Sequence, residues 1–155
     1  MKEILFRGQT RRYGEKRLNV AGDKMPSNWV YGGICKGDGD HSIIYGSNAY
    51  PDLRICDKYA VYSDTIGQYT GIIDKNGKKL FEGDIIKFIS EDGVEVIAVV
   101  TYDVNAMQFV FETKFSIYTL SDISSLFDNG KEERFEFIGN IFDNPELINF
   151  ECEFN

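Results

Sequence analysis

The sequence has few of the residues on which disulfide and metal chemistry depend. Its 155 residues include three Cys and a single His. An odd number of Cys argues against a disulfide framework and predicts a reducing, cytoplasmic setting. Cys35, Cys56 and Cys152 contain no C-x-x-C spacing, which argues against zinc or a thioredoxin-like role; Cys35 and Cys56 are predicted to be buried. His41 alone excludes a two-histidine metal site within one chain.

Long apolar segments and enzyme motifs are also missing. The apolar run 94–100 is far shorter than the roughly 18 to 20 residues that a membrane span needs, so no membrane association is expected. The first residues have no apolar core or small-residue cleavage site, so no secretory signal is expected. The sequence contains no nucleophile elbow, phosphate-binding loop or dinucleotide fingerprint. We therefore predict a protein that is not an enzyme and that needs no cofactor or metal.

Charge is distributed unevenly along the chain, whose net charge is -8. Residues 1–36 contain eight basic and three acidic residues, and the remainder contains nine basic and 22 acidic residues. Complementary charge steers association. Two interpretations stay open: the basic arm meets the acidic face of another subunit, or it folds back on its own acidic half.

What the sequence has is turn residues and β-forming residues. Fifteen Gly accompany three Pro, and 14% of residues are aromatic, which is typical of a packed β-rich core. We predict a mainly β fold with one or two short helical turns. The predicted strands are a first hairpin from 2–6 and 17–20, followed by 28–34, 42–45, 59–62, 68–72, 79–81, 85–90, 94–102, 107–112, 115–120 and 134–142.

The last five of these strands follow the order of a small SH3-like barrel, including a short helical turn before the final strand. We place a soft boundary near Ser63, with residues 1–63 as an N-terminal β extension packed on a barrel core of residues 64–155 in one compact unit. A fold analogy of this kind carries no function.

Several local signals refine this prediction. Asn76-Gly77 indicates a type I′ or bulged hairpin turn. Gly32-Gly33 indicates a bulge or a close backbone approach. Ser121 is predicted to cap a helical turn, and Asn144 followed by Pro145 predicts a helix start.

Three blocks in this order resemble the YopX-like proteins. The central block comprises residues 65–71, the turn 74–78 and residues 81–87. Residues 2–7 are similar to the opening of the family and residues 137–147 to its closing block. The resemblance implies a small β-protein of bacteriophages and prophages that acts in the bacterial cytoplasm and self-associates, with no established chemistry. Its residues are carried over only as a fold signature: Gly67, Gln68, Tyr69, Gly71, Asp74, Gly77, Glu82, Gly83, Asp84, Gly139, Asn140, Asn144 and Pro145.

Two acidic segments are candidate metal sites. Glu82 and Asp84, with Asp64 or Asp74 nearby, could serve a metal-dependent hydrolase, but adjacent acids in this pattern are more typical of a solvated turn. Residues 38–42 have the oxygen-rich composition of a calcium loop without its glycine and distal Glu, which favours a polar turn.

A basic arm provides the other candidate site. Its cations alternate with Phe6 and Tyr13, a pattern that suits phosphate contact with base stacking, although a solvated surface hairpin is the more frequent outcome. The candidate nucleic-acid contacts are Arg7, Arg11, Arg12, Lys16 and Arg17.

The leading hypothesis is therefore a non-catalytic, self-associating phage accessory protein that contacts an unknown host or phage protein. The alternative is a nucleic-acid binder, or an acidic mimic of nucleic acid, in phage regulation.

Overall fold

The structure is a computed structural model that describes residues 3–10, 29–36, 41–47, 57–90, 92–124 and 135–148. It is mainly β, as predicted, with eleven strands and only short helices among the described residues. Contacts divide the chain into two units, residues 1–68 and 69–155, and this division lies close to the predicted boundary near Ser63. No helix in the described ranges is long and apolar enough to cross a membrane.

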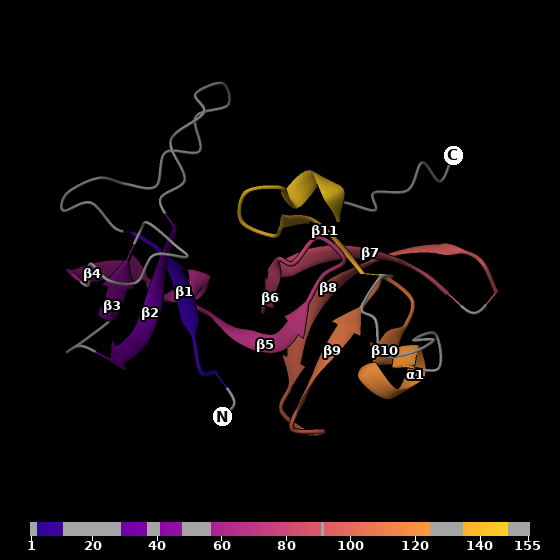
Figure 1. Ribbon diagram of the computed structural model, residues 1–155, viewed down its shortest axis with the longest axis horizontal. Coiled ribbons are helices and arrows are strands. Elements are labelled where there is room, and N and C mark those ends of the chain that lie inside the picture. Colours follow the sequence, from indigo (N-terminus) through magenta and orange to yellow (C-terminus); the bar gives the residue numbers. More distant parts are fainter. Residues whose placement is uncertain are drawn as a thin grey trace. The chain divides into compact units, whose positions relative to one another are not determined.

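Unit 1 is an antiparallel sheet in which strands lie side by side in the order β4-β3-β2-β1 (Figure 1). The first residues of β5 pair with the other side of β1. Val30, Ile44 and Val61 form its buried core. The strands are β1 (Phe6–Gln9), β2 (Trp29–Lys36), β3 (His41–Ser47), β4 (Asp57–Tyr62) and β5 (Gly67–Ile73), with the 3-10 helix η1 (Ser63–Thr65) between β4 and β5.

The first strand differs from its prediction. It begins at Phe6, where the predicted strand 2–6 ends, and it pairs with β2 and β5. The predicted hairpin partner 17–20 lies outside the described residues. Thr65 explains part of the shift, because its hydroxyl accepts the backbone N–H of Gln9 at 2.9 Å and donates to the carbonyl of Tyr62 at 2.6 Å.

The predicted close backbone approach occurs at Gly32, which pairs with Gly46 across β2 and β3. A Cβ on Gly32 would overlap the carbonyl oxygen of Tyr45, whereas a Cβ on Gly33 would meet nothing within 4 Å. Only the first of the two glycines is therefore required by packing.

Unit 2 contains the later residues of β5, paired with β6 (Lys79–Phe81), and a five-stranded antiparallel sheet. Its order is β10-β9-β8-β7-β11, so the five predicted strands and their succession are confirmed. The specific SH3-like barrel is not confirmed, because the sheet is open among the described strands, with β10 and β11 at its edges. The elements are β7 (Asp84–Ile89), β8 (Glu95–Asp103), β9 (Gln108–Glu112), β10 (Ile117–Thr119), α1 (Leu120–Ser124), β11 (Glu136–Asn140) and the 3-10 helix η3 (Pro145–Leu147).

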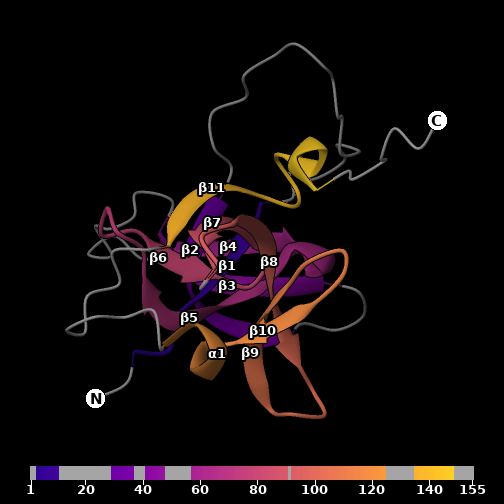
Figure 2. The ribbon, with the colours of Figure 1, turned by 90° about the vertical axis from the view of Figure 1, so that its right-hand side faces the viewer.

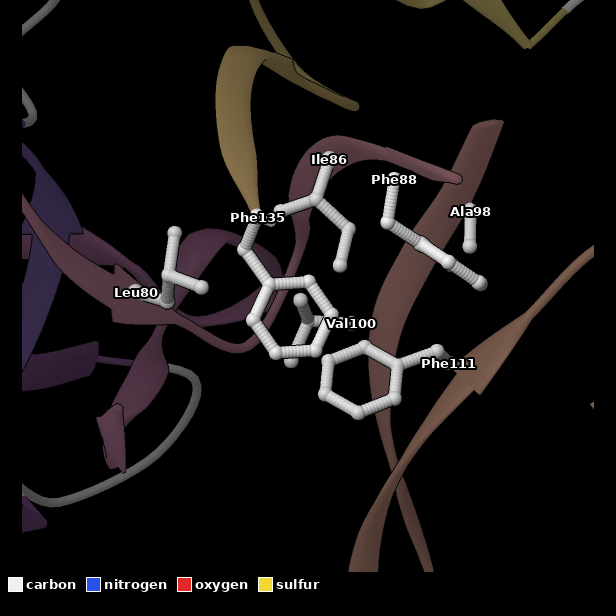
Figure 3. Packing of buried hydrophobic residues seen from close by; sticks show 7 residues of the cluster. All are labelled: Leu80, Ile86, Phe88, Ala98, Val100, Phe111 and Phe135. Atoms are coloured by element: carbon white, nitrogen blue, oxygen red, sulfur yellow. The ribbon is translucent and has the colours of Figure 1, made fainter. Parts of the chain in front are cut away.

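The core of unit 2 lies on one face of this sheet. Figure 3 shows Phe135 and Phe111 with their rings close together, and the ring centroids are 5.1 Å apart in a stacked arrangement. Phe88 meets Phe135 edge to face at 5.8 Å. Burying large aromatic rings in this way is a main source of stability in a small β-domain. The buried members are Leu80, Ile86, Phe88, Ala98, Val100, Phe111 and Phe135.

The short helix α1 lies beside β9 and β10 (Figure 2). Its start is fixed by Thr119, and the prediction that Ser121 is the cap was wrong. The Thr119 hydroxyl accepts the N–H of Asp122 at 3.2 Å, and the Asp122 carboxylate accepts the N–H of Thr119 at 2.8 Å. This reciprocal pair is a capping box, which satisfies two backbone donors at once.

Candidate functional site

The central signature turn is held together by Asp74. Its Oδ1 accepts the backbone N–H groups of Asn76 and Lys78, at 2.9 and 2.8 Å, and its Oδ2 accepts that of Phe137 at 3.1 Å. Only Gly77 in this turn has a positive φ, 84°, so the turn is the bulged form of the two predicted and not type I′. The carboxylate of Asp74 is therefore a structural acceptor that ties the turn to β11.

The turn between β6 and β7 also has a structural explanation. The Oδ2 atom of Asp84 accepts the backbone N–H of Phe81 at 2.8 Å, and Asp84 is completely buried. Gly83 has a φ of 89°, donates its N–H to the carbonyl of Val100 and accepts the N–H of Ile141. Glu82 is half-buried, so in the pair Glu82 and Asp84 only Glu82 reaches solvent.

The closing block forms one local unit. Asn140 is buried, and its Oδ1 accepts the N–H groups of Phe142 and Asp143 at 3.0 and 2.9 Å. The Oδ1 atom of Asn144 accepts the N–H of Asn140 at 3.3 Å and occupies the space that a Cβ on Gly139 would need. Asn144 is the N-cap residue of η3 and Pro145 begins this helix, as predicted, but the Asn144 side chain makes no capping hydrogen bond.

The remaining signature residues lie in β5. Gly67 pairs with Arg7 and Gln68 with Phe6 across the two strands, so Gln68 is half-buried inside the sheet. Gly71 has a φ of 90° at an irregularity in the pairing of β5 with β6.

Tyr69 is buried, with its ring 5.7 Å from that of Phe81. The ammonium of Lys79 lies 5.1 Å from the centre of the Tyr69 ring. The phenol ring is therefore a packing element with a cation over one face.

Arg7 is the one member of the predicted nucleic-acid contact that lies among the described residues. It is 3% exposed, and its guanidinium carbon lies 4.6 Å from the centre of the Trp29 ring. A side chain buried against a ring in this way is not presented to a phosphate backbone. The other predicted contacts lie outside the described residues: Arg11, Arg12, Lys16 and Arg17.

The other candidate ligands are dispersed. Within the described residues, no three His, Cys, Asp or Glu side chains come together as a metal site. His41 begins β3 opposite Tyr62. Cys35, near the end of β2, is exposed, which corrects its prediction as a buried side chain. Cys56, Cys152 and most of the segment 38–42 lie outside the described residues.

An exposed charge network runs across the sheet of unit 2. The ammonium of Lys75 lies 3.0 Å and that of Lys87 3.5 Å from Oε2 of Glu136. The hydrogen bond and charge of Lys75, followed by the charge of Lys87, lower the pKa of the Glu136 carboxyl below its usual value. Lys87 also approaches Glu95 at 3.9 Å.

The feature that sequence reasoning missed is a set of exposed apolar side chains at the β10 edge, here called the edge apolar cluster: Phe115, Ile117 and Leu120. Their exposed fractions are 83%, 58% and 42%. Thr113 fixes the turn that presents Phe115, because its hydroxyl accepts the N–H groups of Phe115 and Ser116 at 3.3 and 2.9 Å. The available signal was three large apolar residues within one short predicted strand, 115–120.

The comparisons with known proteins agree with this architecture. A family model described as YopX protein matches residues 23–149, which includes the central and closing blocks but not the opening block. No curated protein matches the chain. The crystal structure of protein EF1440 from Enterococcus faecalis is similar, with 19% identity, a TM-score of 0.50 and coverage of 96% of this chain and 99% of that chain. At this identity the likeness shows the fold alone. The family match spans most of the sequence, and the chain belongs to the YopX family.

Proposed function

We propose that the protein is a non-catalytic accessory protein of a bacteriophage or prophage, acting in the bacterial cytoplasm, that self-associates and contacts a protein partner. The observation that carries the proposal is the edge apolar cluster. Exposed large apolar residues that gather at one place are a mark of protein interfaces, whereas single ones are ordinary. Phe115 is the most exposed large apolar side chain among the described residues.

The roles of the signature residues support a non-catalytic protein. Asp74, Asp84 and Asn140 are buried and accept backbone N–H groups. A general base or metal ligand needs a lone pair directed to substrate or metal in an accessible site. Oδ1 of Asp74, Oδ2 of Asp84 and Oδ1 of Asn140 accept backbone N–H groups instead.

The scaffold of unit 2 fits an SH3-like origin, which we include in the proposal. Its sheet places the last strand β11 beside the first strand β7, and a short helix precedes that last strand. At the β10 edge, unit 2 presents the edge apolar cluster.

Analytical ultracentrifugation across protein concentration tests the proposal. We expect a concentration-dependent increase in sedimentation coefficient at low salt. A protein that sediments as a monomer at high micromolar concentration would contradict self-association. A phage or host protein retained by the wild type and not by a Phe115→Ser variant would identify the partner contact.

The second candidate is nucleic-acid binding, favoured only by the excess of basic residues within residues 1–36. Mobility-shift measurements with single- and double-stranded probes at two salt concentrations separate the two functions, because phosphate contacts weaken steeply with salt. Loss of a salt-dependent shift on changing Arg11, Arg12 and Arg17 to Ala would favour this candidate. The burial of Arg7 counts against it.

A further inference from the structure

At the β10 edge, few backbone N–H and C=O groups are available to pair with another strand. Thr113 donates its backbone N–H to the carbonyl of Ser116 at 2.8 Å, beside the turn that joins β9 and β10. Antiparallel pairs alternate between hydrogen-bonded and non-hydrogen-bonded. Ile117, opposite Glu112, is then in a non-hydrogen-bonded pair, and its N–H and C=O point away from β9.

Thr119 is the next residue whose backbone N–H and C=O point outward, and the capping box occupies both groups. Its N–H is accepted by Asp122 at 2.8 Å, and the carbonyl of a residue in the N-cap position accepts the first bond of the helix. The exposed edge thus reduces to the N–H and C=O of one residue, Ile117. A long open edge invites uncontrolled pairing, whereas an edge of one residue permits only one register.

Two copies of this edge, related by a two-fold rotation, would place opposite charges beside each other. Lys114 precedes β10 and Asp122 follows it, and both are exposed. If two β10 strands lie antiparallel, Lys114 of each copy comes to the end where Asp122 of the other lies. Two-fold interfaces are the most common in homo-oligomers and require this kind of self-complementarity.

We propose that the β10 edge binds a second copy of this chain across a two-fold axis at Ile117. This inference rests on the proposed self-association and specifies its interface. The two Ile117 residues exchange N–H···O=C hydrogen bonds, and their side chains lie next to each other. Phe115 of each copy packs toward Leu120 of the other, and Lys114 pairs with Asp122 at both ends.

A charge-swap experiment tests this register. Lys114→Glu places Glu against Asp122 of the other copy, and Asp122→Lys places Lys against Lys114, so each variant repels its own copy twice. A mixture of the two variants restores attraction at both ends. We expect each variant alone to sediment as a monomer and the equimolar mixture to form dimers as the wild type does.

Because Asp122→Lys removes the capping box, a second pair keeps the test independent of helix α1. Ser121→Lys leaves Asp122 in place and puts a cation at the same end of the strand. It is expected to associate more weakly than the wild type when alone, because the new cation repels Lys114 of the other copy while Asp122 still attracts it. Mixed with Lys114→Glu, it is expected to associate more tightly than either variant alone. Dispersed amide NMR spectra check that each variant is folded.

Apolar variants provide the matched control. Phe115→Ser is expected to raise the dimer dissociation constant about tenfold or more, as for a central interface side chain. Val104→Ser removes a side chain that is 76% exposed at the turn between β8 and β9. This variant is expected to change the dimer dissociation constant by less than about twofold.

The outcomes separate the two proposals. A wild type that associates while the mixtures stay monomeric, or while Phe115→Ser has no effect, overturns the β10 interface and leaves self-association standing. A monomeric wild type overturns both.

Discussion

The carboxylate of Asp74 accepts the backbone N–H of Phe137 at 3.1 Å, across 63 residues of sequence. The adjacent Lys75 donates its N–H to the carbonyl of Phe135 at 2.9 Å. Together these bonds cover the start of the outward side of β11, one edge strand of the sheet of unit 2. At the other edge, Asp122 accepts the N–H of Thr119 in the same manner. An aspartate thus closes backbone donors at both edges, which limits uncontrolled strand pairing.

Asp74→Ala is predicted to destabilise unit 2. The side chain is 4% exposed and accepts three backbone N–H groups, which lose their acceptor when it is removed. Hydrogen bonds to a charged group contribute about 1.5 to 3 kcal/mol each, and these three are part-buried, so we expect a loss of about 2 to 4 kcal/mol in the free energy of unfolding. Urea unfolding measures it. Asp92→Ala, at an exposed position before Gly93, is the control and should change this value by less than about 0.5 kcal/mol. Equal effects of the two variants would contradict the role of Asp74.

Gly32→Ala is predicted to disrupt the sheet of unit 1, because the new Cβ would overlap the carbonyl oxygen of Tyr45 in the adjacent strand. Backbone cannot move aside without breaking the β2–β3 pairing, so we expect a loss of more than about 2 kcal/mol. Gly33→Ala is the matched control, since its Cβ meets nothing within 4 Å. Thermal unfolding of both variants checks the prediction, which fails if Gly33→Ala is as damaging as Gly32→Ala.

Most of the strand positions could be predicted from the sequence. Strand 79–81 and the succession of the last five strands are those observed, because alternating apolar residues and turn glycines are local signals. The prediction placed strand β1 about one strand length too early in the sequence. Its observed position depends on the long-range hydrogen bond between Thr65 and Gln9. The cap at Thr119 was missed because both Thr119 and Ser121 suit an N-cap by residue type.

The candidate site was much less predictable. From residue type alone, Asp74 and Asp84 are equally compatible with metal binding and with backbone capping. The distinction depends on burial and on partners such as Phe137, which lies 63 residues away. Arg7 has the same ambiguity, which its stacking on Trp29 resolves toward a structural role. The edge apolar cluster could not be predicted without knowing that β10 is an edge strand, and the order of strands is a property of the whole sheet.

The capping box predicts a pH dependence at α1. The backbone N–H of Thr119, and then its hydroxyl, lower the pKa of Asp122 below 3.8. A lowered pKa in the folded state means that the carboxylate contributes stability above its unfolded pKa and loses it as pH falls through the folded value. We expect the NMR titration of the Asp122 carboxyl carbon to have its midpoint below 3.8. Thr119→Val should raise this midpoint without restoring it fully, because the backbone N–H remains. A midpoint unchanged by Thr119→Val would show that the hydroxyl bond does not form.

The charge network predicts that the two lysines beside Glu136 act unequally. Lys75 lies 3.0 Å and Lys87 3.5 Å from the same carboxylate oxygen, and the hydrogen bond and charge of Lys75 are the larger causes of the lowered pKa of Glu136. Lys75→Met should therefore raise this pKa more than Lys87→Met, as followed by NMR of the Glu136 carboxyl carbon. Because the network is exposed, 0.5 M salt should reduce the difference between the two variants. Lys114→Met, at an exposed lysine with no such bond to Glu136, serves as the control and should leave the titration unchanged. A larger effect of Lys87→Met would reverse the assignment and make Lys87, in β7 beside β11, the principal partner of Glu136.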